Sequence, residues 1–184
     1  KLSEYSHWRE KSRESKKPGE PLIGVGLATV NKSSGGPRFI LNDTARLIIE
    51  PSGRVTAYTG VSPHGQGTET SFAQIVADEL GILPFDVRVL HGDTDMIPFG
   101  RGTSASRGII LGGSALKSVL QDVRQKLAKI ASRVLKCPAE DVEVQQERVF
   151  NKTDPGQGIS FDELAAAAYN EELLPPDVEA GLEF

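Results

Sequence analysis

The chain has 184 residues, which is enough for one domain or at most two small ones. Hydrophobic residues make up 38% of it, and 21 Lys and Arg against 25 Asp and Glu leave a net charge of −4. That hydrophobic content is sufficient for a core, so the composition excludes an intrinsically disordered chain. The charge balance disfavours a general nucleic-acid-binding surface, although a local basic patch stays compatible with it.

A single cysteine, Cys137, limits the chemistry that the chain can hold by itself. One thiol cannot form an intrachain disulfide, a cysteine-rich zinc site or an iron–sulfur cluster. No stretch approaches 18 apolar residues and the first twenty residues are charged, so we expect no transmembrane helix, no signal peptide and a cytoplasmic location. The chain starts at Lys1 and its only methionine is Met96, which indicates a processed product or a piece of something longer.

The N-terminal part is predicted to contain strands before its first long helix. Residues 1–20 form a charged segment typical of a solvated helix or a frayed terminus. Residues 22–30 are apolar with two glycines and read as a strand. The β-rich runs 45–50 and 54–59 flank a Pro-Ser-Gly turn, which is a hairpin signature. We therefore expect three antiparallel strands in succession.

Helical periodicity dominates the rest of the chain. Apolar residues recur at helical spacing after Gly67 until Gly81, which is placed to cap the helix end, and a strand follows over residues 87–90. A second and longer helical pattern runs from about Ser104 to Leu135. The runs 142–145 and 148–151 then form a short hairpin.

The last predicted helix, residues 161–170, opens on a capping box formed by Ser160 and Glu163. Strands and helices thus mix without a strict βαβ alternation. The predicted fold class is α+β, with a small α/β layer as the alternative.

The first loop that could carry chemistry spans residues 62–70, where a strand gives way to a helix. Its glycines allow a close approach of the backbone to a ligand, and Thr68 or Thr70 is placed to cap the helix. The free amides of a helix N-terminus favour an anion such as phosphate. Gln66 adds an amide that both donates and accepts hydrogen bonds.

The second loop spans residues 100–107 and is again predicted to lie at a helix start. Thr103, Ser104 and Ser106 place three hydroxyls between Arg101 and Arg107, a donor set that suits several phosphate oxygens. Two such loops in one small domain predict a single site for a diphosphate ligand. The pattern is neither a Walker A loop nor a Rossmann fingerprint.

Each of these features also has a purely structural interpretation. Both loops are compatible with turns whose only role is capping. His64 reads more readily as a hydrogen-bonded turn residue than as a base, and Asp93 and Asp95 form either a carboxylate pair or an ordinary turn. Arg107 suits a phosphate or a structural ion pair, and Cys137 is expected to be a small buried group.

The two loops, taken in order along the chain, resemble the molybdenum hydroxylases of the xanthine oxidase family. The first block reads His-Gly-Gln-Gly-Thr-Glu-Thr over residues 64–70, with Leu-Gly-Ile at 80–82. The second block carries Gly-Asp-Thr-Asp at 92–95, Gly-Thr at 102–103 and Ser-Arg at 106–107. The chain looks most like the large, molybdenum-binding subunit of the aerobic carbon monoxide dehydrogenase group, over most of residues 24–181.

The resemblance implies a cofactor and its contacts. The expected group is a molybdopterin cytosine dinucleotide carrying molybdenum, with residues 21–184 forming part of the domain that binds it. Gln66, Gly67 and Thr68 are implied to face the pterin and its phosphate, and the second loop is implied to hold the cofactor. Those second-loop residues are Thr103, Ser104, Ala105 and Ser106.

Departures from the family pattern restrict what the chain is expected to do alone. The family's catalytic glutamate lies in a Gly-x-Gly-Glu turn that this sequence lacks, and no copper-binding Cys-Ser/Ala-Phe-Arg loop occurs. We therefore expect no catalytic residue and no metal ligand in this chain. Iron–sulfur clusters and FAD are expected on partner subunits, in an oligomer that also contains the rest of the molybdenum-binding subunit.

Three hypotheses follow for the function. The leading one is a fragment or subunit of a molybdenum hydroxylase, of the carbon monoxide, aldehyde or xanthine dehydrogenase type, that contributes to cofactor binding and is inactive alone. The second is a stand-alone module for another nucleotide diphosphate. The third is a structural or interaction domain whose loops are only caps and turns.

Overall fold

The computed structural model describes residues 2–12, 18–21, 24, 26–32 and 42–184. The chain divides into two compact units, Lys1–Ser33 and Ser34–Phe184. In the first unit, helix α1 (Leu2–Lys11) covers half of the charged N-terminal segment, residues 1–20. The strand expected over residues 22–30 is partly outside the described residues, and the described positions 24 and 26–30 belong to no strand. That prediction is wrong for these positions, because no neighbouring strand pairs with them.

A three-stranded sheet organises the second unit. Strands β1 (Ala45–Ile49) and β2 (Val55–Thr59) form the predicted antiparallel hairpin, and β3 (Val87–His91) pairs with β2 in parallel. Helix α2 (Thr68–Leu80) makes the crossover between the two parallel strands. This first sheet therefore contains one antiparallel pair and one βαβ unit, instead of the three antiparallel strands in succession expected for this part of the chain.

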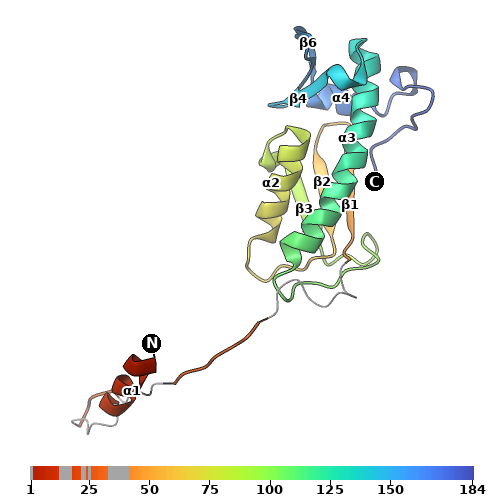
Figure 1. Cartoon of the computed structure of the whole chain (residues 1–184). Coiled ribbons are helices and arrows are strands. Elements are labelled where there is room, and N and C mark those ends of the chain that lie inside the picture. Colours follow the sequence, from red (N-terminus) through yellow and green to blue (C-terminus); the bar gives the residue numbers. More distant parts are fainter. Residues whose placement is uncertain (1, 13–17, 22–23, 25, 33–41) are drawn as a thin grey trace. The chain divides into compact units, whose positions relative to one another are not determined.

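Two helices cover one face of this sheet (Figure 1). Alternate residues of β1 and β2 point toward α2 and toward α3 (Gly113–Leu135), so Leu47, Ile49 and Val55 are almost fully buried. The apolar side chains of α3 recur every three or four residues and complete the core from above. Each of the two helices follows one of the loops, so both loops lie at the end of the sheet where the helices begin.

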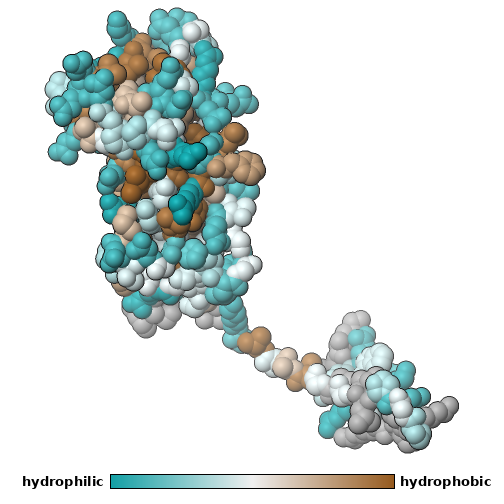
Figure 2. Space-filling model, turned by 180° about the vertical axis from the view of Figure 1, so that it is seen from behind, coloured by the Kyte–Doolittle hydropathy of each residue, from teal (hydrophilic) through white to brown (hydrophobic). Residues whose placement is uncertain are grey.

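The opposite face of the sheet is only partly covered in the described part of the chain. Ile48, Tyr58 and Leu90 alternate with the core positions and are half-buried. From that side, hydrophobic residues show between hydrophilic ones in the middle of the unit (Figure 2).

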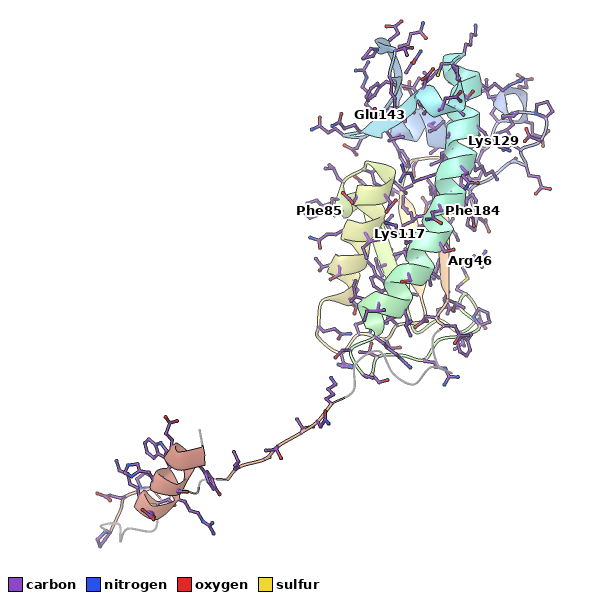
Figure 3. The ribbon with its side chains drawn as sticks, viewed as in Figure 1. Arg46, Phe85, Lys117, Lys129, Glu143 and Phe184 are labelled. Carbon is purple, nitrogen blue, oxygen red and sulfur yellow. The ribbon has the colours of Figure 1, made fainter. Side chains whose placement is uncertain are left out.

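The C-terminal residues pair with the free edge of β1. The amide of Leu47 donates to the carbonyl of Phe184 at 3.0 Å, and the amide of Phe184 donates to the carbonyl of Leu47 at 3.0 Å. Arg46 adds an ion pair with Glu183 at 2.9 Å, and both Arg46 and Phe184 lie at this edge in Figure 3. The last three residues thus act as a short extra strand.

A second sheet packs at the far end of α3. It contains β4 (Val142–Gln145), β5 (Arg148–Asn151) and β6 (Asp154–Ser160), all antiparallel, and leads into α4 (Phe161–Ala167). The predicted hairpin and capping box are confirmed: Ser160 accepts from the amide of Glu163, and the Glu163 carboxylate accepts from the amide of Ser160. Short 3-10 turns occur at Pro84–Asp86, Ala139–Asp141 and Glu171–Leu173. Among the described residues no helix is long and apolar enough to cross a membrane.

Candidate functional site

The first loop leads from β2 into the N-terminus of α2. The residue that caps this helix is Gly67, at φ 75°, and no side chain makes a capping hydrogen bond. The prediction that Thr68 or Thr70 caps the helix is wrong, because the chain enters the helix through a left-handed glycine and Thr68 is already inside the first turn. The first-turn amides therefore lack a side-chain acceptor and retain the partial positive charge of a helix N-terminus.

Gln66 joins the two loops. Its Oε1 accepts from the backbone N–H of His64 at 2.7 Å, and its Nε2 donates to Thr68 Oγ1 at 2.9 Å and to Thr103 Oγ1 at 3.3 Å. One amide side chain thus closes the first loop on itself and ties it to the second. The two predicted site segments, 37 residues apart in sequence, are neighbours in the structure.

The second loop is an irregular turn and not a helix start. The helical path begins only at Gly108, with a π-helical segment Gly108–Gly112 that runs into α3, so the predicted start at Ser104 is wrong. Ala105 and Ser106 have φ angles of 50° and 52°. Residues with a Cβ rarely adopt such angles, and each costs about 1–3 kcal/mol unless surrounding contacts impose it. Two consecutive strained residues indicate that contacts with surrounding residues hold the loop in this shape.

The tip of this turn keeps its own hydrogen-bond donors free. Within the described residues, the hydroxyls of Ser104 and Ser106 and the amides of residues 104–106 have no protein partner. Ser104 and Ser106 are exposed and Ala105 is half-buried. Successive backbone N–H groups in a left-handed turn are a known way to build an anion-binding concavity. The arrangement therefore suits phosphate oxygens.

Two glycines allow the loops to cross in contact. A Cβ on Gly100 would lie 2.5 Å from the Cα of Gly60, and a Cβ on Gly60 would lie 2.3 Å from Oδ1 of Asp43. The amide of Gly102 donates to the carbonyl of Gly60 at 3.2 Å, and the hydroxyl of Thr44 donates to the carbonyl of Phe99. The crossing brings the residues before β1, after β2 and before α3 into one cluster.

A buried charge lies within this cluster. Arg107 is only 5% exposed; its Nη2 donates to the carbonyl of Arg101 at 2.9 Å, while its Nε has no partner in the described structure. Asp43 lies near enough for the charge of Arg107 to affect it. Burial raises the pKa of Asp43, and the Thr44 amide and the Arg107 charge oppose that rise.

The other polar candidates have structural roles. Asp93 Oδ1 accepts from the amides of Asp95 and Met96 at 3.0 and 3.2 Å, so the Gly-Asp-Thr-Asp segment is an Asx-type turn and not a carboxylate pair. Sequence reasoning missed the pair between His91 Nε2 and Glu69 Oε1 at 3.1 Å, since the two residues are 22 positions apart.

No cluster of three or more His, Cys, Asp or Glu that could hold a metal occurs among the described residues. Cys137 is buried as expected, and burial raises the pKa of its thiol. The cluster of loops therefore offers hydrogen-bond donors to an anion.

Comparison with known proteins identifies this architecture. The family model for the molybdopterin cofactor-binding domain matches residues 1–182. The chain belongs to this family. The predicted resemblance to molybdenum hydroxylases is thereby confirmed, and so is the predicted α+β class, since the similar solved structures share this fold.

Relatives of the domain occur in several oxidoreductases. The chain is 37% identical to the 6-hydroxypseudooxynicotine dehydrogenase complex subunit gamma of Paenarthrobacter nicotinovorans, over 89% of this chain and 20% of that protein. It is 35% identical to the carbon monoxide dehydrogenase large chain of Afipia carboxidovorans, over 93% of this chain and 22% of that one. The chain thus spans about a fifth of the length of the curated relatives that it matches.

Solved structures show the same arrangement of elements. Quinoline 2-oxidoreductase from Pseudomonas putida 86 matches with a TM-score of 0.72 and 35% identity, over 77% of this chain and 18% of that one. Reconstituted CO dehydrogenase from Oligotropha carboxidovorans matches with a TM-score of 0.71 and 38% identity, over 78% and 18%.

Proposed function

We propose that this domain supplies one wall of the cofactor site of a molybdenum hydroxylase and has no catalytic activity alone. The whole enzyme is an oxidoreductase of the carbon monoxide, aldehyde or xanthine dehydrogenase type. The observation that carries the proposal is the pair of loops joined by Gln66, with unpaired donors at the tip of the second loop. Membership of the molybdopterin-binding family supports the choice of ligand.

The two loops have different tasks in this proposal. Gln66, Gly67 and Thr68 face the pterin and its phosphate, where the uncapped N-terminus of α2 favours negative charge. The turn over residues 103–106 holds the diphosphate of a cytosine dinucleotide form through its hydroxyls and amides. When bound, the molybdenum cofactor supplies the two-electron oxidation chemistry. The residues of this chain bind and orient it.

The remaining parts of the enzyme lie on other polypeptide segments. The rest of the molybdenum-binding subunit completes the cleft, and iron–sulfur and flavin subunits carry electrons away in an oligomeric, cytoplasmic complex. Support for a further part of the subunit comes from the relatives, whose chains are about five times longer than the matched part.

The proposal is tested in the full enzyme by replacing Gln66 with Ala. This change removes the hydrogen bonds to His64, Thr68 and Thr103 together, so we expect molybdenum and pterin content per protein to fall about tenfold. Metal is measured by mass spectrometry and pterin by fluorescence after oxidation. The matched control is Gln125→Ala on the exposed surface of α3, which leaves both contents at the wild-type level.

Two results would contradict the proposal. One is a Gln66→Ala enzyme with full molybdenum occupancy. The other is tight binding of a free nucleotide diphosphate by the chain without the rest of the enzyme, measured by calorimetry, which would favour an independent nucleotide-binding module.

A further inference from the structure

Arg107 is a buried cation, and few groups in the described structure offset its charge or accept its hydrogen bonds. Its side chain turns back beneath the loop that it terminates and donates to the carbonyl of Arg101, six residues earlier. Its own amide donates to the carbonyl of Ser104 at 3.2 Å. The guanidinium therefore closes the turn from beneath, and its Nε is left without an acceptor. A buried charge is costly unless it is paired and hydrogen-bonded, so incomplete pairing at Arg107 calls for an explanation.

The turn at residues 104–106 needs contacts that hold its conformation. Ala105 and Ser106 lie at consecutive positive φ angles without the freedom of glycine. The loop is held at two other points, by Gln66 at Thr103 and by the carbonyl of Gly60 at Gly102. Both points precede the strained residues, and Arg107 follows them. The strained pair is thus held between fixed points on both sides.

Asp43 supplies negative charge on the same side of the loop. Its carboxylate lies against the Gly60–Gly100 crossing and is fixed by the amide of Thr44 at 2.9 Å. It is near enough to Arg107 for the two charges to interact, although no direct hydrogen bond joins them. Asp43 is therefore one described group whose charge acts on the buried guanidinium.

We propose that Arg107 is a positioning residue, whose buried guanidinium holds Ala105 and Ser106 in the left-handed turn that presents the donors of residues 104–106 to the cofactor diphosphate. Asp43 acts as its counter-charge. This inference rests on the proposed function, and it assigns to Arg107 an indirect role beneath the binding surface in place of direct contact with phosphate.

The decisive experiment is a glycine rescue in the full enzyme. Arg107→Met removes the closure, and we expect molybdenum and pterin content to fall about tenfold. Adding Ala105→Gly to Arg107→Met restores most of the loss, because glycine adopts the positive φ without help. Arg107→Lys keeps the charge opposite Asp43 and gives an intermediate content.

Controls separate this role from a general effect on folding. Arg124→Met removes an exposed arginine of α3 that pairs with Glu79 of α2 at 2.9 Å, and cofactor content stays at the wild-type level. Full cofactor content in Arg107→Met overturns the inference. A loss that Ala105→Gly does not reverse also overturns it.

The same series distinguishes this inference from the proposed function. If Gln66→Ala loses the cofactor while Arg107→Met keeps it, only the role of Arg107 fails. If both variants keep it, the proposed function fails as well.

Discussion

The first loop turns into α2 through Gly65 and Gly67, whereas the second loop turns through Ala105 and Ser106, although all four residues have positive φ angles. In the first loop the conformation is intrinsic to the residue type. In the second the two residues have side chains, and hydrogen bonds on either side of them, at Thr103 and from Arg107 to Arg101, hold the loop next to the glycine crossing. The two loops have similar chemistry but therefore differ in which substitutions would destabilise them.

The largest expected effect comes from filling the crossing beneath the second loop. In Gly100→Ala the new Cβ meets the backbone of Gly60 at 2.5 Å, which cannot rotate away. We expect a loss of about 3 kcal/mol in the free energy of unfolding, the upper end for overpacking. Urea unfolding measures it, with Gly24→Ala as the control because nothing lies within 4 Å of a Cβ there. Equal stabilities for Gly100→Ala and the wild type would contradict the described crossing.

The next prediction exchanges glycine and alanine at positions of positive φ in the two loops. Gly67→Ala meets no atom within 4 Å, so its cost is that of a left-handed alanine, about 1 kcal/mol. Ala105→Gly removes the same cost, partly offset by the greater freedom of the unfolded chain, and stabilises by less than about 1 kcal/mol. Thermal and urea unfolding give the two signs. Changes of the same sign would show that the loops do not differ as described.

A smaller effect is expected from separating the loops. Thr103→Val removes the hydroxyl that accepts from Gln66 at 3.3 Å and should cost about 1 kcal/mol. Amide hydrogen exchange should also become faster around Thr68, because Gln66 loses one of its anchors. Thr94→Val, at an exposed threonine outside the two loops, is the matched control. Unchanged exchange in Thr103→Val would mean that Gln66 holds the first loop without help from the second.

The smallest effect lies outside both loops, at Glu79 on α2. Lys117, labelled in Figure 3, and Arg124 each contact its carboxylate at 2.9 Å, and the Lys117 hydrogen bond is the main cause that lowers the pKa of Glu79 from its ordinary value of 4.5. Because the folded pKa is lower, the contribution is fully present above pH 4.5 and is lost as the pH falls through the folded value.

Glu79→Gln should therefore reduce the stability difference between neutral and acidic pH by less than about 1 kcal/mol, since both partners are exposed. Urea unfolding at a series of pH values measures this, and Glu143→Gln, whose carboxylate has no ion-pair partner in the described structure, is the control. A larger stability change for Glu143→Gln than for Glu79→Gln would contradict it.

Local sequence signals predicted the regular elements well. The hairpin of β1 and β2, the glycine at the end of α2, the end of α3 at Leu135 and the capping box of α4 all follow from turn residues and periodicity. Strand β6 was missed because its sequence, Asp-Pro-Gly-Gln-Gly-Ile-Ser, reads as a turn. The parallel pairing of β3 depends on the crossover by α2, which no local pattern specifies.

In the candidate site, too, local features could be predicted and long-range contacts could not. Both loops were found from their glycines and hydroxyls. The bond between Gln66 and Thr103 was not, because it joins residues 37 positions apart. Nor does any residue type signal the turn at Ala105 and Ser106, because residues with a Cβ rarely adopt a positive φ.

These long-range contacts bear on the order of events during folding. The site is joined by hydrogen bonds across 37 residues, from Gln66 to Thr103, and across 55, from Thr44 to Phe99. Contacts of such separation form late, after the local hairpin and helices, because closing long loops costs entropy first. The contacts described for the second loop, at Thr103, Gly102 and Arg107, are made within the protein. If the proposed function holds, the cofactor should therefore enter a cleft wall that has already folded, so that loading follows folding and does not drive it.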